Sequence, residues 1–573
     1  ETVLLILSGS VEQSLYFLRL KEGIFQEIGD FNVVEKIWPY GFSGALVQSG
    51  DFLWRVDLSG KKEKLLDLPT GLISLDLSWE SGILRIGALV GNFCTSKPNI
   101  PQVFPQTREN VTLRFYTSSE GWLDLAEIPE GCNGLSLSSN GMRMVWREPI
   151  NAVIEEANRA EFYGIDLENK KVQSLTKGAG QVGKALMKRD GSGLIYQANH
   201  ELKRPITTHM DIWWKGWTDK EPRNLTGGGR CIENFGWVIG EESIWITTVQ
   251  GLNLKTELLK IDGSTKLGSF GHLAATSSVA WFPNGVPAFE TEGLVDLPSI
   301  WTGDRQVVLP HQEAFEDLHV VPIQWTSPDG LDIEGVVYEA EGTSSEAPLL
   351  VRVHGGPAGT VEALRSQAIR HRHLLRAGYR VFNPAFRGSL GFGDAFAQGN
   401  IGCQGEADLV DILSGIEYLD NSGWFNVSRV GIFGGSYGGY LTLRALAITD
   451  RFLTGVALYG FVDIRRVTME TGDFTYETEY MAPITWPIKK EVRKSDVFSH
   501  LGKIQVPLLM LHGDKDQICP VSESIVTYRA LVDLGIQVSL VVYPEEGHGF
   551  KKKVNQQDSA RRTLAWFLEH IPP

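Results

Sequence analysis

The 573-residue sequence has few cysteines, no excess of positive charge and no long apolar run. Its five cysteines are widely spaced and form no Cys-x-x-Cys pair: Cys94, Cys132, Cys231, Cys403 and Cys519. An odd, scattered set of this kind argues against a disulfide framework and against a cysteine-bound zinc ion. It predicts reduced thiols and a cytoplasmic location.

The charge and the apolar pattern exclude two further classes of partner. The formal net charge is −15, and a protein that binds nucleic acid needs a basic surface to contact phosphates. No apolar run approaches the roughly 18–20 residues that span a bilayer. The sequence opens on ETVLLILSGS, which has no basic segment ahead of its apolar residues, so we expect neither a signal peptide nor a membrane anchor.

The sequence changes character near residue 316. Its length exceeds that of one compact core, so two or more domains are expected. Residues 1–316 contain short β-rich runs separated by Gly, Asn, Asp and Ser, whereas residues 317–573 alternate apolar strand-like runs with longer helical patterns. We therefore divide the chain into these two domains.

The first domain repeats a degenerate theme of an apolar or aromatic strand, a turn, a polar hairpin and another strand. Seven instances begin at Ser14, Asp51, Leu113, Glu161, Asp211, Thr256 and Ser299. The step of roughly 45–50 residues is the size of one four-stranded propeller blade. Because blades stack in a ring to bury their faces, we predict a β-propeller, with seven blades. A pair of large β-sandwiches is the alternative.

The second domain reads as strands alternating with helices, which predicts a doubly wound, mostly parallel sheet. Helical patterns cover residues 364–377 and the segments EADLVDILSGIEYLD, YLTLRALAI and DSARRTLAWFLEHI. Buried strands are expected in APLLVRVHGG, YRVFNPAF, RVGIF, VPLLMLHG and VSLVVYP.

The strongest local signal is GIFGGSYGGY, which contains the pattern G-x-S-x-G as Gly434, Ser436 and Gly438. It lies between an expected strand at Arg429–Phe433 and a helix expected to begin near Tyr440. This is the strand–turn–helix context of a nucleophile elbow, in which the glycines let strand and helix approach around a strained serine. The pattern predicts an α/β-hydrolase domain with Ser436 as the nucleophile.

A serine hydroxyl needs a base and the base needs an orienting carboxylate. His548 lies in PEEGHGF, directly after the last expected strand, and glycines on both sides let the loop bring its imidazole over the sheet. The loop after VPLLMLHG offers two carboxylates, Asp514 and Asp516. Either one preserves the chain order Ser, Asp, His of this fold, and spacing alone does not choose between them.

The tetrahedral intermediate of acyl transfer needs N–H donors for its oxyanion. One donor is expected from the residue after the nucleophile, Tyr437, and the other from the glycine loop RVHGGP. We assign the second donor to Gly356. His354 either contributes to the site or only shapes this loop.

Taken together, these residues resemble the prolyl oligopeptidase family of serine peptidases. The motifs are SPDGLDIEGVVYEA, HGGP, NPAFRGSLGFGDAF, GGSYGGY, HGDKDQICP and EEGHGF, in this order. HGGP and GGSYGGY look most like the acylaminoacyl-peptidase and aminopeptidase branch. Family members place the triad aspartate four residues after the His of the HG pair, here His512, so the resemblance selects Asp516.

The resemblance implies a β-propeller that caps an α/β-hydrolase domain, with the active site between them. The implied reaction is hydrolysis of a peptide bond through an acyl-enzyme, with no cofactor and no metal. Short peptides, or small esters and amides, would enter while folded proteins are excluded by size. The family includes monomers, dimers and larger assemblies, so a homo-oligomer stays open.

Two features depart from the family pattern. Many members carry an arginine two positions after the triad aspartate, where it holds a substrate carbonyl, but this chain has Ile518 there. The double-glutamate anchor for a substrate amine is not recognisable either. The acidic, aromatic segment ETGDFTYETEYM supplies three other candidates for facing a substrate ammonium, Glu470, Glu477 and Glu479, and a solvated loop is the alternative.

The sequence thus supports a serine peptidase of the aminopeptidase or oligopeptidase type. A serine esterase, or a biosynthetic hydrolase or acyl-transfer enzyme with the same triad, is the alternative, because fold and triad do not separate amide from ester chemistry. An inactive propeller scaffold is a third hypothesis, against which the complete set of Ser, Asp, His and HGGP argues.

Overall fold

A computed structural model describes residues 317–471 and 495–573 without interruption and most of residues 2–308. The longest segments left out of that N-terminal part are 92–109, 151–158 and 200–208. Within the described part, no helix is both long and apolar enough to cross a lipid bilayer. The four cysteines in this part, Cys132, Cys231, Cys403 and Cys519, are thiols.

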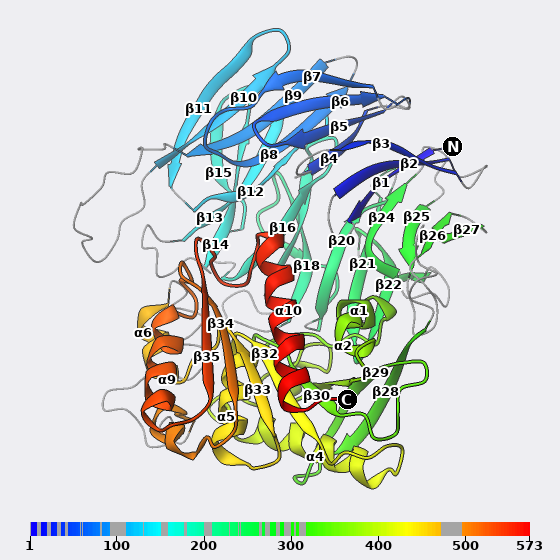
Figure 1. The fold of residues 1–573 in the computed structure, drawn as a ribbon. Helices are drawn as coiled ribbons and strands as arrows, with labels where there is room; N and C mark the ends of the chain where they lie inside the picture. Colours follow the sequence, from blue (N-terminus) through cyan, green and yellow to red (C-terminus); the bar gives the residue numbers. More distant parts are fainter. Residues whose placement is uncertain are drawn as a thin grey trace.

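The described N-terminal residues form seven small antiparallel sheets that follow one another along the chain, one of three strands and six of four (Figure 1). The strands of the first four sheets are β1 (Thr2–Ser8), β2 (Gln13–Arg19) and β3 (Ile24–Asp30); β4 (Lys36–Tyr40), β5 (Gly44–Ser49), β6 (Phe52–Asp57) and β7 (Lys62–Asp67); β8 (Leu72–Glu80), β9 (Ile83–Gly91), β10 (Asn110–Thr117) and β11 (Gly121–Pro129); and β12 (Asn133–Leu137), β13 (Arg143–Pro149), β14 (Ala160–Asp166) and β15 (Lys171–Ser174). Those of the last three are β16 (Val182–Met187), β17 (Gly193–Asn199), β18 (Met210–Gly216) and β19 (Arg223–Asn224); β20 (Cys231–Trp237), β21 (Ser243–Gln250), β22 (Asn253–Lys260) and β23 (Lys266–Ser269); and β24 (Ala275–Trp281), β25 (Pro287–Thr291), β26 (Ser299–Thr302) and β27 (Arg305–Val308).

Consecutive sheets bury their apolar faces against one another. Leu89 and Leu113 of the sheet β8–β11 share a core with Met144 and Trp146 of the next sheet. Strand β12 likewise contacts β8 of the sheet before it and β16 of the sheet after it. A succession of small sheets packed face to face is the architecture of a β-propeller, rather than of two large sandwiches.

The C-terminal part is built on one eight-stranded sheet with the order β28-β29-β31-β30-β32-β33-β34-β35. The pairs β28–β29 and β29–β31 are antiparallel, and every later pair is parallel. The strands are β28 (Leu318–Thr326), β29 (Asp332–Ala340), β30 (Leu349–Val353), β31 (Arg380–Ala385), β32 (Val430–Gly435), β33 (Thr454–Leu458), β34 (Leu508–Gly513) and β35 (Val538–Tyr543).

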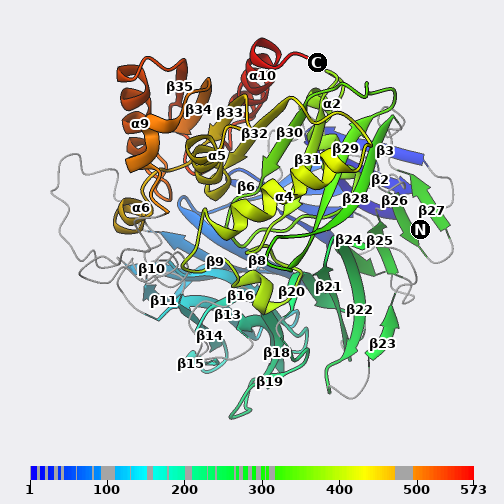
Figure 2. The same cartoon turned by 90° about the horizontal axis from the view of Figure 1, so that it is seen from below.

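Helices cover both faces of this sheet (Figure 2). One face packs against a core that includes Leu409, Leu441 and Leu531 from α4, α5 and α9. The other packs against Leu374 from α2 and Phe567 from α10. The helices are α1 (Arg365–Arg370), α2 (Arg372–Leu375), α3 (Asp394–Ala397), α4 (Ala407–Asn421), α5 (Tyr437–Ile448), α6 (Ile464–Glu470), the 3₁₀ helix η4 (Phe498–Lys503), α9 (Val521–Asp533) and α10 (Lys553–His570).

Three helices differ from their predicted extents. The helix predicted for residues 364–377 is two short helices, α1 and α2, which meet at His371. Helix α5 begins at Tyr437 rather than near Tyr440, and α10 begins five residues before Asp558. The glycines after Tyr437 have low helix propensity, but packing against the neighbouring strands overrides such a weak local preference.

The two parts of the chain meet through polar contacts near the catalytic sheet. The ring Nδ1 of His209, just before β18, lies 2.6 Å from Oδ1 of Asp394 in α3. The backbone N–H of Gly251 donates to the carbonyl of Gly391 at 2.8 Å. These contacts join two of the N-terminal sheets to the loops at the carboxyl ends of the parallel strands, where α/β proteins place their sites.

Candidate active site

Ser436 occupies the sharp turn between β32 and α5, with a φ of +59°. A serine with positive φ is strained, and such strain is typical of a nucleophile elbow. The neighbouring glycines are required by close backbone packing. A Cβ on Gly434 would lie 2.4 Å from the carbonyl oxygen of Val353, and one on Gly438 would lie 2.2 Å from it. The carbonyl oxygen of Val353, the last residue of β30, therefore leaves no room for a side chain at either glycine.

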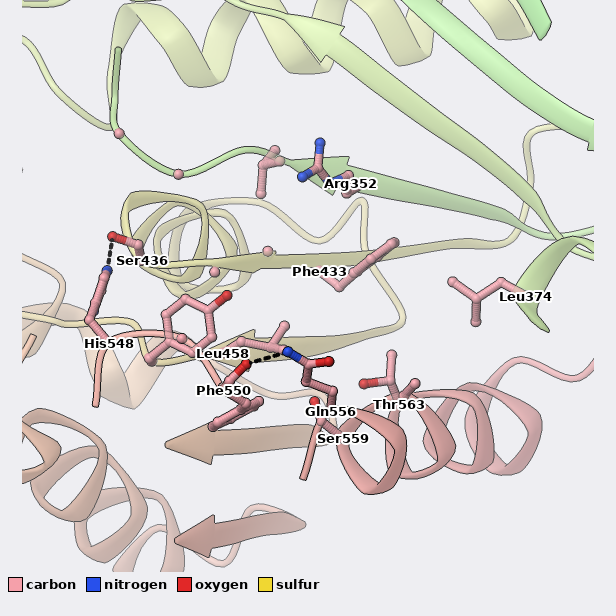
Figure 3. A pocket seen from close by; sticks show the side chains of 18 of the residues that line it. Arg352, Leu374, Phe433, Ser436, Leu458, His548, Phe550, Gln556, Ser559 and Thr563 are labelled. Atoms are coloured by element: carbon pink, nitrogen blue, oxygen red, sulfur yellow. Dashed lines mark hydrogen bonds between the residues drawn. The ribbon is translucent and has the colours of Figure 1, made fainter. Parts of the chain in front are cut away.

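The structure brings Ser436, His548 and Asp516 into one line of hydrogen bonds. Nε2 of His548 lies 2.9 Å from Oγ of Ser436 (Figure 3). Nδ1 of the same ring lies 2.9 Å from Oδ2 of Asp516 and 3.1 Å from Oδ1. With a proton on Nδ1, Nε2 is left as the acceptor for the serine hydroxyl.

Asp516, rather than Asp514, is the carboxylate at the histidine. Oδ1 of Asp516 accepts hydrogen bonds from the backbone N–H groups of Ile518 and Cys519, both at 2.9 Å. Asp514 is exposed, and its Oδ1 accepts instead from the backbone N–H of Glu545 at 2.7 Å. One loop aspartate therefore orients the base, while the other joins two loops at the surface.

Asp516 is held in its ionised form. Its burial opposes ionisation, but hydrogen bonds from His512 and His548 outweigh that effect, and the pKa of Asp516 lies well below its ordinary value. His512 is itself fixed, because Nδ1 lies 2.8 Å from Oγ of Ser524 and Nε2 lies 2.7 Å from the carbonyl of Cys519. The carboxylate is thus available to stabilise an imidazolium on His548.

Gly356, one of the two expected oxyanion donors, lines the same cavity as Ser436, and Tyr437, the other, directly follows Ser436 in the chain. Gly356 belongs to the loop after β30, and a Cβ on its neighbour Gly355 would lie only 3.2 Å from Cβ of Ser436. Tyr437 is the first residue of α5, where the positive end of the helix dipole favours negative charge. Both positions suit an oxyanion that forms next to Ser436.

His354 shapes the glycine loop and lies outside the cavity at Ser436. Its ring stacks on Phe386 with 4.2 Å between ring centroids. Nε2 lies 2.8 Å from Oγ of Ser389, and Nδ1 lies 2.8 Å from the carbonyl of Gly355. Burial lowers the pKa of His354 to about 4, so the ring is neutral. These contacts favour the loop-shaping alternative over contact with substrate.

Two other sequence candidates, Ile518 and Glu470, are not among the residues that line the cavity at Ser436. Ile518 packs against the apolar core and lines a shallow surface hollow beside His548. Glu470, at the end of α6, is paired with Arg466 at 2.7 Å and is exposed. Glu477 and Glu479 lie outside the described residues. An ammonium-binding role for the three glutamates therefore remains a sequence-based hypothesis.

A cavity of about 600 Å³ opens at Ser436 and runs between the sheet and helices α2 and α10 (Figure 3). Its lining includes Gly356, His548 and Tyr459. The Tyr459 ring lies 5.1 Å from the His548 ring in an edge-to-face contact. Sequence reasoning missed this tyrosine, because no motif marks a residue that simply follows a buried strand.

Asp408 was also missed, although it supports the residue after the nucleophile. It is fully buried on α4, and one of its carboxylate oxygens accepts a hydrogen bond from the hydroxyl of Tyr437. Burial, partly offset by this bond and by one from Asn400, raises the pKa of Asp408 to about 6. In the sequence it resembled one more polar residue of an amphipathic helix.

This shift predicts a pH-dependent stability. In the unfolded chain the Asp408 carboxyl ionises near the ordinary aspartate pKa of 3.8, whereas in the folded protein it holds its proton up to about pH 6. The folded state therefore binds more protons between these values, and its stability falls as pH rises through them. At 1.36 kcal/mol per pKa unit, the loss is about 3 kcal/mol.

Asp408→Asn is expected to abolish that loss while keeping an oxygen acceptor for Tyr437. The measurement is the free energy of unfolding of both proteins at pH 4, 5, 6 and 7. The control is Asp420→Asn, since Asp420 is an exposed aspartate on the same helix and its variant should follow the wild-type curve. Parallel curves for wild type and Asp408→Asn would show that the buried carboxyl does not titrate in this range.

Comparison with known proteins finds a family match for the segment that carries this geometry. Residues 367–572 match the model of the prolyl oligopeptidase family. The chain is 28% identical over 242 residues to acylamino-acid-releasing enzyme 1 of Oryza sativa subsp. japonica, covering 40% of this chain and 31% of that protein. It is 29% identical over 235 residues to the acylamino-acid-releasing enzyme of Arabidopsis thaliana, covering 39% and 30%. The chain thus spans about a third of the length of these curated relatives.

Solved structures match over the whole chain. An acylaminoacyl peptidase of Pyrococcus horikoshii superposes with a TM-score of 0.82 at 18% identity, covering 100% of this chain and 94% of that one. A puromycin hydrolase superposes with a TM-score of 0.71 at 17% identity, covering 99% and 92%. At these identities the likeness establishes the fold alone. The segment of this chain that matches the prolyl oligopeptidase family, residues 367–572, carries Ser436, Asp516 and His548.

Proposed function

We propose that this protein is a serine peptidase that hydrolyses short peptides through an acyl-enzyme on Ser436. The observation that carries the proposal is the hydrogen-bonded line from Ser436 Oγ through His548 to Asp516. This line lies at the mouth of a cavity large enough for a small substrate group. The match to the prolyl oligopeptidase family supports peptide bonds as the target.

In the proposed acylation step, Ser436 attacks the scissile carbonyl while His548 Nε2 accepts the hydroxyl proton. Asp516 stabilises the imidazolium that forms and keeps the ring in the required orientation. The backbone N–H groups of Gly356 and Tyr437 stabilise the oxyanion. His548 then gives its proton to the leaving amine, and the acyl group stays on Ser436.

Deacylation reverses these roles with water as the nucleophile. His548 takes a proton from the water, which attacks the ester carbonyl on Ser436, and the same two N–H groups stabilise the second oxyanion. His548 finally protonates Ser436 Oγ as the acid product leaves. Asp516 stays ionised throughout, since its pKa lies well below its ordinary value.

The arrangement of the domains is part of the proposal. We assign residues 1–316 to a β-propeller and residues 317–573 to the α/β-hydrolase domain. The interval between the end of β27 at Val308 and the start of β28 at Leu318 supports this boundary. The seven successive small sheets support seven blades. A propeller above the carboxyl ends of the parallel strands would admit short peptides and exclude folded proteins.

The substrate's amino terminus can be either acylated or free, and two observations bear on which is preferred. The curated relatives are named acylamino-acid-releasing enzymes, which favours substrates with an acylated amino terminus. Ile518 stands where many family members have a carbonyl-binding arginine, and its side chain cannot donate that hydrogen bond. We therefore place free-amine peptides beside acylated ones as candidate substrates.

The test is kcat/KM for a matched series of aminoacyl, dipeptidyl and N-acetyl-aminoacyl amides together with a short-chain aryl ester. Cleavage of any of the amides, with a kcat/KM that depends on Ser436, supports the peptidase. The most efficient amide then identifies the preferred terminus. If only the ester is turned over, the proposal of a peptidase is wrong, and the protein is an esterase with the same triad.

A further inference from the structure

A partly buried arginine, Arg352, lines the cavity at Ser436. Successive side chains of β30 point to opposite faces of the sheet. Val351 and Val353 lie in the core on the α4–α5 face, whereas Leu350 lies in the core on the α2–α10 face. Arg352 therefore points to the same side as Leu350, and it lines the cavity.

The guanidinium of Arg352 has no carboxylate partner among the residues that the structure describes. The side-chain amide of Asn383 has one orientation in which both its oxygen and its nitrogen form hydrogen bonds. In that orientation, its oxygen accepts a hydrogen bond from Nη1 of Arg352 at 3.2 Å. Burial lowers the pKa of Arg352; Arg370 disfavours its charged form, and Tyr338, Tyr459 and Glu362 favour it. A neutral amide compensates a desolvated cation only in part.

Two buried arginines of this domain, by contrast, are neutralised directly. Arg387 is paired with Asp411 at 2.7 Å, and Arg380 is paired with Glu339 at 2.8 Å. Both also donate to further oxygens, as buried guanidinium groups generally do. Arg352 differs from these two because it lines an open cavity and is paired with no acid among the residues that the structure describes.

The cavity around Arg352 is suited to an anion. No aspartate or glutamate is among its lining residues in the described part of the chain. Figure 3 shows Arg352 on one side and Gln556, Ser559 and Thr563 of α10 on the opposite side, with Ser436 and His548 at one end. Tyr459 adds a hydroxyl, and burial raises its pKa, so that it stays a donor.

We propose that this cavity binds a carboxylate of the substrate, with Arg352 as its ion-pair partner, while the scissile carbonyl lies at Ser436. The inference rests on the proposed function for the identity of the bond that is cleaved. The carboxylate belongs either to the acyl part or to the leaving group, and both sources share the same recognition by a guanidinium. A bound carboxylate would supply the negative charge that the described residues do not place beside Arg352.

Binding is measured first, without turnover. Isothermal titration of the Ser436→Ala protein compares 4-phenylbutyrate with 4-phenylbutyramide, which share a carbon skeleton and size but replace an anionic acceptor oxygen by a neutral NH₂ group. We expect the carboxylate to bind more tightly, and we expect Arg352→Met in the same background to reduce this preference by about 10- to 100-fold. Arg352→Lys keeps the charge and should retain part of the preference.

The matched control is Arg370→Met. Arg370 is an exposed arginine on α1, outside the cavity lining, that acts on Arg352 only through its charge. This variant should keep the preference for the carboxylate. A cooperative thermal transition for each variant shows that it is folded. Methionine suits the site, because it fills similar space without a charge.

Hydrolysis then distinguishes the two sources. The acyl arm compares 4-nitrophenyl monoglutarate with 4-nitrophenyl pentanoate, and the leaving-group arm compares butyrate esters of 4-hydroxybenzoate and 4-hydroxybenzamide. In each arm, kcat/KM for the charged ester is divided by kcat/KM for the neutral ester. The arm in which Arg352→Met lowers this ratio shows whether the acyl part or the leaving group enters the cavity. Equal binding of carboxylate and amide by the Ser436→Ala protein, or a preference that Arg352→Met leaves intact, would overturn the proposal. Wild-type protein that turns over no substrate contradicts the proposed hydrolysis and leaves the binding result standing.

Discussion

Ser436→Ala is expected to lower kcat/KM for the best substrate by about 10⁴-fold or more. The hydroxyl at 2.9 Å from His548 Nε2 is the group that becomes acylated in the proposed mechanism. Alanine removes it without disturbing the turn, since a methyl group is smaller than the serine side chain. The measurement is kcat/KM for the most efficient amide of the series, together with labelling by a fluorophosphonate, which reacts with an activated serine.

Ser428→Ala is the control. Ser428 is exposed and lies two residues before strand β32, whereas Ser436 directly follows the other end of that strand. This variant should keep its turnover and its label, whereas Ser436→Ala should lose both. Residual activity within tenfold of wild type in pure Ser436→Ala protein would mean that another group performs the chemistry.

Asp516→Asn is expected to lower kcat by about 10⁴-fold while leaving the protein folded. Oδ1 of Asp516 accepts from two backbone N–H groups, so the amide oxygen of an asparagine would occupy that position. Its NH₂ group would then face Nδ1 of His548, where Oδ2 lies at 2.9 Å in the native protein. The imidazole would have to carry its proton on Nε2 and could no longer accept the proton of Ser436.

The same substitution at the neighbouring aspartate is the control. Asp514 is exposed and contacts the backbone of Glu545 rather than the imidazole, so Asp514→Asn should change kcat by no more than a few-fold. Steady-state kinetics over the amide series, with a thermal melt of each variant, makes the comparison. If the two variants lose similar activity, the orienting role does not belong to Asp516 alone.

That Ser436 and His548 lie side by side was predictable because their signals are local. Gly434, Ser436 and Gly438 stand next to one another in the chain, and each has a steric reason to be there. His548 follows the last strand within a glycine-flanked loop. For both residues the neighbouring sequence determines the turn, and the order of strands determines which edge of the sheet the turn occupies.

The orienting carboxylate needed more than local sequence. Asp514 and Asp516 share one loop, and the family resemblance selected the second. The structure shows the physical difference, since the N–H groups of Ile518 and Cys519 bind Asp516 while the N–H of Glu545 binds Asp514. Backbone direction within a loop depends on contacts with other segments, which the sequence pattern does not contain.

The roles of His354 and Glu470 show the same limit. Both residues carry chemistry that suits a substrate, and His354 also lies within one of the motifs of the site. In the structure Phe386 and Ser389 hold His354 inside the glycine loop, and Arg466 pairs with Glu470 at the surface. The type of a residue determines which interactions it can form. Which partners it contacts depends on the fold, and the sequence pattern around the residue does not identify them.

By itself, the sequence predicted a division near residue 316, the strand–helix alternation around a parallel sheet, and loops at the sheet edge that carry Ser436, His548 and the glycine loop. These follow from periodicity and from turn chemistry, which act over a few residues. Only the tertiary structure decided that Asp408 supports Tyr437 from inside α4 and that Arg352 lines a cavity with no acid among its described lining residues. Burial and charge compensation are properties of the packed molecule, because they depend on which side chains the fold brings together from separate segments.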